Sequence, residues 1–356
     1  MKALVMTGPW ALEVAEIADP APGPGDVVVR ITATGICGSD FHGFTGDTGR
    51  RHAGQVMGHE TVGYVEWVGA AVTDPGLSPG ALVTINPVLS CDSCEVCAAG
   101  AEQSCPNRTV IGVAPQLVSA FAERVVVRAS NVVPLAAGLD PDLGALVEPL
   151  AVGYHAAVRG ACAPADRVLV IGGGPIGQAC LLAAQRLGAT AVAVSDVNPL
   201  RRDLCASFGA RVIDPLAAAR AEGGLGAAVA EALGGKATLV IDAVGLTPTV
   251  RDAIEASVFG ARIVLVGMGT PSVELPAYGI STEERSLIGS FCYSREHFAA
   301  TATWVGETTV PLGRLIDGRV GYDGAAAAFT DLAKGSTDAS KILVYPGGVP
   351  TPGESR

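Results

Sequence analysis

Four cysteines lie close together between residues 91 and 105, at a spacing that suits a metal site. Two-residue gaps let one loop wrap around an ion, and Zn²⁺ takes four thiolates in closed tetrahedral sites. Asp92, Ser93 and Glu95 between them are polar, so the segment has no core of its own and a metal would supply the cross-link. An iron–sulfur cluster and four free thiols are the alternatives. The predicted structural zinc ligands are Cys91, Cys94, Cys97 and Cys105.

A second segment, Gly-Gly-Gly-Pro-Ile-Gly over 172–177, fits the pattern G-x-G-x-x-G. It follows an apolar run at 167–171 and opens a helical pattern, which is the context that dinucleotide-binding folds require. There the glycines make a tight turn, let the backbone approach a pyrophosphate and allow close helix packing. Proline suits the first helical turn. A glycine-rich turn in another α/β protein is the alternative. The predicted cofactor contacts are Gly172, Gly174, Pro175, Ile176 and Gly177.

An aspartate at the end of the next apolar run predicts which dinucleotide is bound. Asp196 stands about 20 residues beyond the glycines, where a carboxylate accepts hydrogen bonds from the adenosine ribose and repels a 2′-phosphate. This favours NAD over NADP. Arg201 lies within reach of the same ribose, and with its neighbour Arg202 it weakens that preference slightly.

Other residues of metal-binding type are dispersed along the chain. Cys37 lies in the segment 35–42, His59 and Glu60 follow Gly58, and Glu148 lies in an apolar segment. Each also has an ordinary interpretation, as a buried thiol, a core histidine or a solvated glutamate. Spacing alone does not bring them together.

The elements that would position these residues fall into two kinds. Short β-like runs at 27–31, 61–68, 81–85 and 124–128 indicate a β-rich first part. Beyond residue 150, six apolar runs alternate with helical patterns, which predicts a doubly wound parallel sheet. These six runs are 167–171, 191–194, 211–213, 239–244, 262–266 and 286–289. The tail combines helical stretches near 296–305 and 324–334, a strand at 341–345 and a frayed end at 350–356.

The predicted architecture is therefore an α/β chain in which one domain interrupts another. A dinucleotide-binding domain over 153–289 is inserted into a β-rich domain formed by 1–152 and 290–356. The length of 356 residues agrees with two domains.

Composition narrows the function classes. Apolar residues make up 49% of the chain, which excludes an intrinsically disordered protein. The net charge of -11 disfavours nucleic acid and anionic membranes as partners. The first residues lack a signal-peptide pattern, and no apolar run reaches membrane-spanning length. Clustered cysteines in such a chain indicate a metal site in the reducing cytoplasm.

Taken in order along the chain, these motifs resemble the zinc-dependent medium-chain dehydrogenases, over essentially the whole length. The segment 145–156 is similar to the polyol (sorbitol-like) and threonine dehydrogenase branches, which carry glutamate where liver-type alcohol dehydrogenases carry a second cysteine ligand. The resemblance implies a GroES-like catalytic domain, a Rossmann NAD-binding domain and two zinc ions per chain. It also implies a homodimer or homotetramer, paired along a sheet edge near 262–269.

The resemblance further implies a catalytic zinc held by Cys37 and His59. Glu148 and Glu60 are the further implied ligands, and in this branch the fourth position is shared among a glutamate, water and substrate. Because adjacent residues of an extended segment point in opposite directions, Glu60 would need a local bend to ligate beside His59. It would otherwise support the site from outside the ligand shell.

A proton relay completes the implied mechanism. Zinc would lower the pKa of a substrate hydroxyl, and the resulting alkoxide would pass a hydride to the nicotinamide. Ser39 is expected to hydrogen-bond the reacting oxygen, and His42 to carry the proton to solvent. A turn serine and a surface histidine are the alternatives.

The remaining reactive residues have simpler interpretations. Arg50, Arg51 and His52 could line the mouth of a substrate site, but a solvated run of loop charges is favoured. Two histidines and four cysteines are predicted to be structural or core residues. They are His155, His297, Cys162, Cys180, Cys205 and Cys292.

The substrate is narrowed by what precedes the cysteine loop. Threonine dehydrogenases carry a histidine there, and residues 85–90 contain none. A secondary alcohol of a polyol, sugar or vicinal diol is therefore the predicted substrate, with NAD as oxidant. Three alternatives are a threonine or other zinc alcohol dehydrogenase, a zinc-independent quinone or enone reductase, and a non-catalytic NAD-binding protein.

Overall fold

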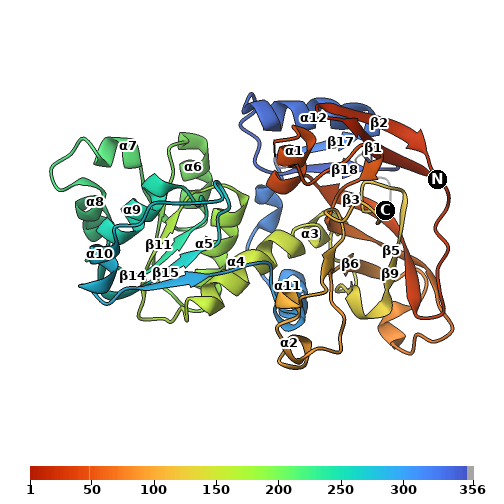
Figure 1. The fold of residues 1–356 in the computed structure, drawn as a ribbon, viewed down its shortest axis with the longest axis horizontal. Coiled ribbons are helices and arrows are strands. Elements are labelled where there is room, and N and C mark those ends of the chain that lie inside the picture. Colours follow the sequence, from red (N-terminus) through yellow and green to blue (C-terminus); the bar gives the residue numbers. More distant parts are fainter. Residues whose placement is uncertain (48, 351–356) are drawn as a thin grey trace. The chain divides into compact units, whose positions relative to one another are not determined.

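The computed structural model describes residues 1–47 and 49–350, and Figure 1 shows its ribbon. The expected frayed end lies, apart from Pro350, outside these described residues. The chain divides into two compact units, one formed by Met1–Glu148 with the segment from Ser294 onward, the other by Pro149–Tyr293. Within the described ranges, no helix is long and apolar enough to cross a membrane.

The first unit is built on mainly antiparallel β-structure. Its largest sheet has the strand order β10-β6-β5-β3-β18-β17, and β9 also pairs with β3. A smaller sheet has the order β2-β1-β4, and β7 pairs with β8. The strands are β1 (Lys2–Gly8), β2 (Ala11–Glu16), β3 (Asp26–Gly35), β4 (Gln55–Val56), β5 (Glu60–Val68), β6 (Leu82–Ile85), β7 (Val88–Leu89), β8 (Thr109–Val110), β9 (Arg124–Arg128), β10 (Val132–Pro134), β17 (Gly318–Gly321) and β18 (Ile342–Tyr345).

Short helices and turns connect these strands. The α-helices are α1 (Gly38–Phe44), α2 (Glu95–Ala98), α3 (Pro141–Gly144), α11 (Arg295–Glu307) and α12 (Tyr322–Lys334). The 3₁₀ turns are η1 (Pro75–Leu77), η2 (Glu102–Ser104), η3 (Ala129–Asn131) and η4 (Leu312–Leu315). Helix α4 (Val147–Arg159) begins in this unit and continues into the other.

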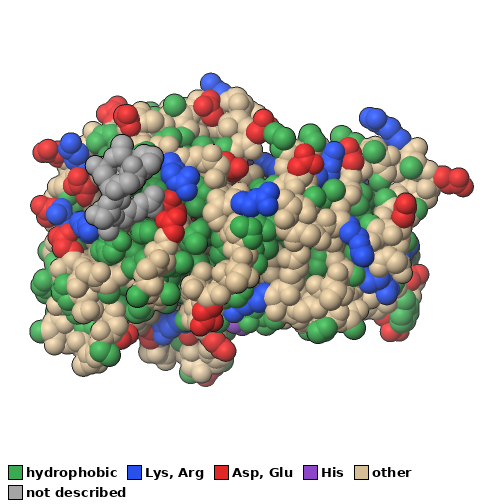
Figure 2. Space-filling model, turned by 180° about the vertical axis from the view of Figure 1, so that it is seen from behind, with side chains coloured by type: hydrophobic (Ala, Val, Ile, Leu, Met, Phe, Trp, Pro, Cys, Tyr) green, Lys and Arg blue, Asp and Glu red, His purple; other side chains and the backbone are tan. Residues whose placement is uncertain are grey.

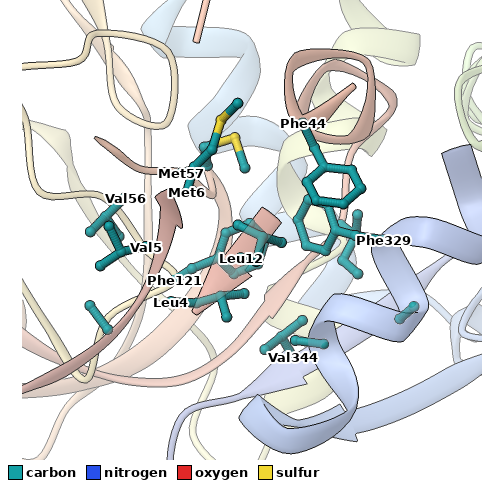
Figure 3. Close-up of a cluster of buried hydrophobic side chains, with 14 of the residues drawn as sticks. Leu4, Val5, Met6, Leu12, Phe44, Val56, Met57, Phe121, Phe329 and Val344 are labelled. Carbon is teal, nitrogen blue, oxygen red and sulfur yellow. The ribbon is translucent and has the colours of Figure 1, made fainter. Parts of the chain in front are cut away.

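One hydrophobic cluster of this unit joins segments from both ends of the chain. Phe44 of α1, Phe121 and Phe329 of α12 pack edge to face, with Phe329 5.5 Å from each of the other two ring centroids. Figure 3 shows these rings beside Leu4 and Val344 of the strands. The edge-to-face geometry is the favourable one for aromatic pairs. This cluster holds α1, which carries several of the candidate site residues, against the C-terminal segment.

The second unit contains the predicted doubly wound sheet. All its strand pairs are parallel, in the order β13-β12-β11-β14-β15-β16, so the predicted fold class is confirmed. The strands are β11 (Arg167–Ile171), β12 (Ala191–Ser195), β13 (Arg211–Ile213), β14 (Ala237–Asp242), β15 (Ser257–Leu265) and β16 (Ser286–Gly289). The helices are α5 (Pro175–Arg186), α6 (Pro199–Ser207), α7 (Pro215–Ala218), α8 (Gly224–Leu233), α9 (Thr247–Glu255) and α10 (Ala277–Ser281).

The sheet corrects one expectation about its edge. The segment 262–269 was expected to be exposed at an edge, but β15 lies between β14 and β16 and is paired on both sides. The edge strand on that side is β16, and β13 forms the opposite edge. The run at 286–289 was itself predicted as a strand, but the order of the runs along the chain does not say which of them lies at the edge of the sheet.

One face of the molecule shows how its charged side chains are distributed. On the face shown in Figure 2, basic side chains are scattered among acidic ones and form no continuous stripe.

Candidate metal centres and dinucleotide loop

Helix α1 positions the first candidate ligand of the dispersed set. Cys37 is its N-cap, and the Cys37 backbone N–H donates to Asp40 Oδ2 at 3.1 Å. This hydrogen bond is part of a capping box, and it fixes the backbone conformation of the turn from which the thiol projects. Ser39 and His42 lie on the same helix, and both side chains are exposed.

A bend before β5 brings two neighbouring residues to the same place. Gly58 has a φ of 96°, and a Cβ there would lie 2.9 Å from Phe121. The chain therefore turns at glycine, and strand alternation begins only at Glu60. The Cys37 Sγ, a ring nitrogen of His59 and a carboxylate oxygen of Glu60 lie within 4.8 Å of one another. These three can hold one metal ion.

Asp40 supports this group from behind. It is fully buried, and its Oδ1 lies 3.5 Å from Nδ1 of His59. The other ring nitrogen is then the one left for a metal, the arrangement usual for ligating histidines. Burial alone would raise the pKa of Asp40, but the charges of His59 and Arg51 outweigh it and lower that pKa. Asp40 is therefore a carboxylate.

Glu60 is shared with a lysine from the far end of the chain. Lys341 donates to Glu60 Oε2 and, at 3.4 Å, to the carbonyl oxygen of Ile36. Both charged side chains are at most 4% exposed. Burial would lower the pKa of Lys341, but Glu60 and Cys37 outweigh it and raise that pKa. The Glu60 carboxylate is therefore paired with the Lys341 ammonium, whether or not it also binds a metal.

Glu148 takes a different position from the other candidate ligands. It is buried in the first turn of α4, and its charge helps to raise the pKa of Lys341. It does not belong to the group of ligand atoms within 4.8 Å of one another among the described residues. The structure therefore places Glu148 near this centre without bringing it into the same group as Cys37, His59 and Glu60.

The four clustered cysteines converge as predicted. Their sulfurs lie 3.4 Å apart for Cys94 and Cys97, 3.5 Å for Cys91 and Cys105, and 3.9 Å for two further pairs. Four ligands at a Zn–S distance of about 2.3 Å in a tetrahedron stand about 3.8 Å apart. Hydrogen bonds from the backbone and side chain of Ser93 lower the pKa of Cys91 to about 5. The group fits one zinc ion.

Ion pairs with residues outside the cysteine loop hold the loop in place. Asp92 accepts from Arg295 at 2.8 Å and from Arg128 at 3.4 Å, and it has a φ of 57°. The Arg295 backbone N–H donates to Glu102 at 3.3 Å. The sequence reasoning missed Arg295, because it lies far along the chain with no local pattern to mark it.

The glycine loop of the second unit has the predicted geometry. Gly172 follows β11 with a φ of 92°, and a Cβ on Gly177 would overlap the Gly172 carbonyl oxygen. Gly174 caps α5, Pro175 is its first residue, and Ile176 follows. Backbone N–H groups at such a helix start bind phosphate.

Asp196 closes this loop from the end of β12. Its Oδ2 accepts from Gly173 N at 2.6 Å, and its Oδ1 accepts from Asn198 N at 2.7 Å. Each oxygen keeps a second lone pair for another donor. Arg201 Nη1 lies 4.0 Å from the same carboxylate. The residues proposed to select the cofactor are therefore together.

Comparison with known proteins identifies the family. Residues 23–137 match the alcohol dehydrogenase GroES-like domain and residues 175–307 match the zinc-binding dehydrogenase family. L-Galactonate-5-dehydrogenase of Escherichia coli (strain K12) is 31% identical over 90% of this chain and 91% of its own length. The chain belongs to the zinc-containing medium-chain alcohol dehydrogenase superfamily. It is an oxidoreductase acting on CH–OH groups.

Further relatives place this dehydrogenase in the polyol and sugar branch. D-Xylulose reductase A of Aspergillus niger is 31% identical over 88% of the chain and 87% of its own length. The crystal structure of galactitol-1-phosphate dehydrogenase from Escherichia coli has a TM-score of 0.86 at 28% identity, covering 97% of this chain and 100% of that one. The predicted family and branch are confirmed.

Several residues of this dehydrogenase differ from their predicted roles. Arg51 was expected in a solvated charge run, yet it is buried beside Asp40, whereas Arg50 and His52 are exposed. Cys162 and Cys292 are only half-buried and not core thiols. Cys180 and Cys205 are fully buried, as expected, and burial raises their pKa to about 12. Charge runs are assigned to solvent by default, and only the folded chain shows which member points inward.

Proposed function

We propose that this dehydrogenase oxidises a secondary hydroxyl of a polyol, sugar or sugar derivative with NAD. The observation that carries the proposal is the convergence of Cys37, His59 and Glu60, beside a helix that presents Ser39 and His42. The three relatives named above refer to L-galactonate, D-xylulose and galactitol 1-phosphate, which are all polyhydroxylated. We extend that substrate class to this chain.

The residues divide the chemistry between them. Cys37, His59 and a glutamate would hold zinc, which would supply a Lewis acid for the substrate hydroxyl, while bound NAD would be the hydride acceptor. Ser39 would hydrogen-bond the reacting hydroxyl and relay its proton, accepting it while giving up its own hydroxyl proton. His42, exposed on the same helix with its ring tilted against Phe41 at 4.6 Å between ring centroids, would accept that proton and release it to solvent. Cys91, Cys94, Cys97 and Cys105 hold the structural zinc. Those thiols ligate only while reduced, which supports a cytoplasmic location.

A substrate panel tests the proposal. NAD reduction is followed at neutral pH over polyols, sugar acids, sugar phosphates, vicinal diols and threonine, with zinc counted per chain. We expect two zinc ions per chain and the highest kcat/KM on a polyhydroxylated secondary alcohol. NAD binding with no turnover on any alcohol would favour a non-catalytic NAD-binding protein, and a preference for threonine would contradict the substrate class.

The cofactor preference rests on Asp196. Replacing it with alanine removes a charged hydrogen-bond acceptor. A hydrogen bond to a charged group contributes about 1.5–3 kcal/mol, so kcat/KM for NAD should fall about tenfold to a hundredfold. The kcat/KM for NADP should rise relative to that for NAD, because Arg201 and Arg202 remain. Steady-state kinetics with both cofactors measure this. Asp203→Ala, an exposed acid on α6, is the matched control. An unchanged cofactor ratio in Asp196→Ala would contradict the assignment.

We also propose that two copies pair along β16. This free edge strand contains no charged residue or proline, and such edges invite pairing with another chain. Apolar side chains exposed around it include Leu287, Phe291, Phe259 and Tyr278. Sedimentation should give two or four chains for the native protein and a smaller species for Leu287→Lys. Leu216→Lys, on exposed α7, should leave the mass unchanged. A native monomer would contradict the proposal.

A further inference from the structure

Arg51 occupies a slot that the fold has shaped for it. It lies between α1 and β4, flanked by the exposed residues Arg50 and His52, yet its own side chain is 2% exposed. Its stem packs on α1 at Gly43, where a Cβ would overlap the Arg51 Cγ. Any larger residue at 43 would displace the arginine stem. The burial of this charge is therefore built into the helix.

The guanidinium faces the group behind the candidate catalytic metal. Arg51 Nη2 lies 3.9 Å from Asp40 Oδ1 and donates to the Ser39 carbonyl oxygen at 3.5 Å. Asp40 Oδ1 is the oxygen that faces His59 Nδ1, while Oδ2 accepts from the Cys37 backbone. Arg51 Nε has no hydrogen-bond partner among the described residues.

A buried cation with so few hydrogen bonds is costly unless a charge nearby balances it. Asp40 is the carboxylate that does so here, and burial lowers the pKa of Arg51 while Asp40 opposes that effect. Two groups thus hold Asp40 in its contact with His59. One is the Cys37 backbone N–H at the start of the helix, and the other is the Arg51 guanidinium from the loop. Because the guanidinium is covered, it acts through Asp40 and not on a substrate.

We propose that Arg51 is a positioning residue for the catalytic zinc, fixing Asp40 and through it the orientation of His59. This inference rests on the proposed catalytic metal assignment. Its contact with the Ser39 carbonyl also ties the loop to the start of the helix that carries the relay hydroxyl. Arg51 therefore links the metal ligands and the proton relay to a loop that contributes no metal ligand and no relay residue.

The test compares four full-length variants. Arg51→Met removes the charge but keeps an apolar stem, Arg51→Lys keeps the charge, and Gly43→Ala displaces the stem without changing any charge. Arg50→Met is the neighbouring control. Zinc release to a chromogenic chelator is timed for both sites. Visible spectra are recorded after dialysis has replaced only the faster-exchanging zinc by cobalt.

Groups outside the ligand shell typically change metal affinity by about 10- to 100-fold. We expect Arg51→Met and Gly43→Ala to release the catalytic zinc faster by such a factor and to shift the cobalt spectrum, with the four-cysteine zinc unaffected. Arg51→Lys should recover part of the loss, and Arg50→Met should match the native protein in both readouts.

Native release and spectra in Arg51→Met would overturn the inference. So would loss of both zinc ions together with the folded state in Arg51→Met, if Gly43→Ala behaves like the native protein. If the native chain oxidises alcohols but the Arg51 variants release zinc at the native rate, this inference fails and the proposed function stands. A native chain that takes up no cobalt at this site would overturn the proposed function as well.

Discussion

His59→Ala should reduce alcohol oxidation by about a thousandfold or more while NAD binding persists. The imidazole is one of three groups whose ligand atoms lie within 4.8 Å of one another, and without it only Cys37 and glutamates that also have other partners remain to hold the ion. Losing the Lewis acid removes several kcal/mol of transition-state stabilisation. About 4 kcal/mol corresponds to about three orders of magnitude in rate.

Zinc stoichiometry makes this result specific. The native chain should contain two zinc ions, and His59→Ala should keep one, because the four-cysteine group is formed by a separate loop. Cys97→Ser should give the complementary loss, accompanied by a lower Tm, since a structural zinc contributes folding energy. Cofactor binding is measured by fluorescence titration and turnover by NAD reduction.

His297→Ala is the matched control for this prediction. It lies on α11 and is half-buried, and its replacement should change turnover only a few-fold. Native turnover in His59→Ala, or two zinc ions retained by it, would show that the trio is not the catalytic centre.

Local sequence patterns were enough to predict the two units' main features. The glycine loop and the four cysteines each lie within one short segment, so spacing reports directly on geometry. The central strands of the parallel sheet are buried on both faces and appear as apolar runs such as 167–171. The alanine-rich segment 216–233 was harder to predict. Its composition is typical of one helical stretch, but Gly223 and Gly224, both with positive φ, separate α7 from α8.

The catalytic group shows where such reasoning stops. Strand alternation suggested that His59 and Glu60 point apart, and the outcome depends on one glycine turn before the strand. The sequence did not predict the roles of Asp40, Arg51 and Lys341, because these roles come from tertiary contacts. Lys341 is 281 residues from Glu60 along the chain. No periodicity can report such a pair, whereas a buried charge in the folded chain identifies it at once.

Lys341→Met should lower kcat about 10- to 100-fold and, at the same time, slow the release of the catalytic zinc. The substitution leaves the Glu60 carboxylate, 1% exposed, without the cation that pairs with it in the structure. An unpaired buried charge costs about 3–5 kcal/mol. A zinc ion between Cys37, His59 and Glu60 is the nearest compensating charge. Glu60 is then expected to bind zinc permanently and to exclude the substrate from the open position that a catalytic zinc needs.

A second substitution separates this explanation from simple loss of stability. In Lys341→Met/Glu60→Gln the neutral amide needs no cation and is a poor zinc ligand, so kcat and Tm should both recover relative to Lys341→Met. Lys334→Met, at the exposed end of α12, is the control for losing one lysine. Turnover and zinc release to a chelator are measured for all three variants. Faster zinc release in Lys341→Met, or no recovery in the double variant, would mean that Lys341 supports the ligand shell rather than restraining Glu60. Slow zinc release combined with low turnover is the result that only a captured Glu60 explains, because a destabilised site would lose its metal and its activity together.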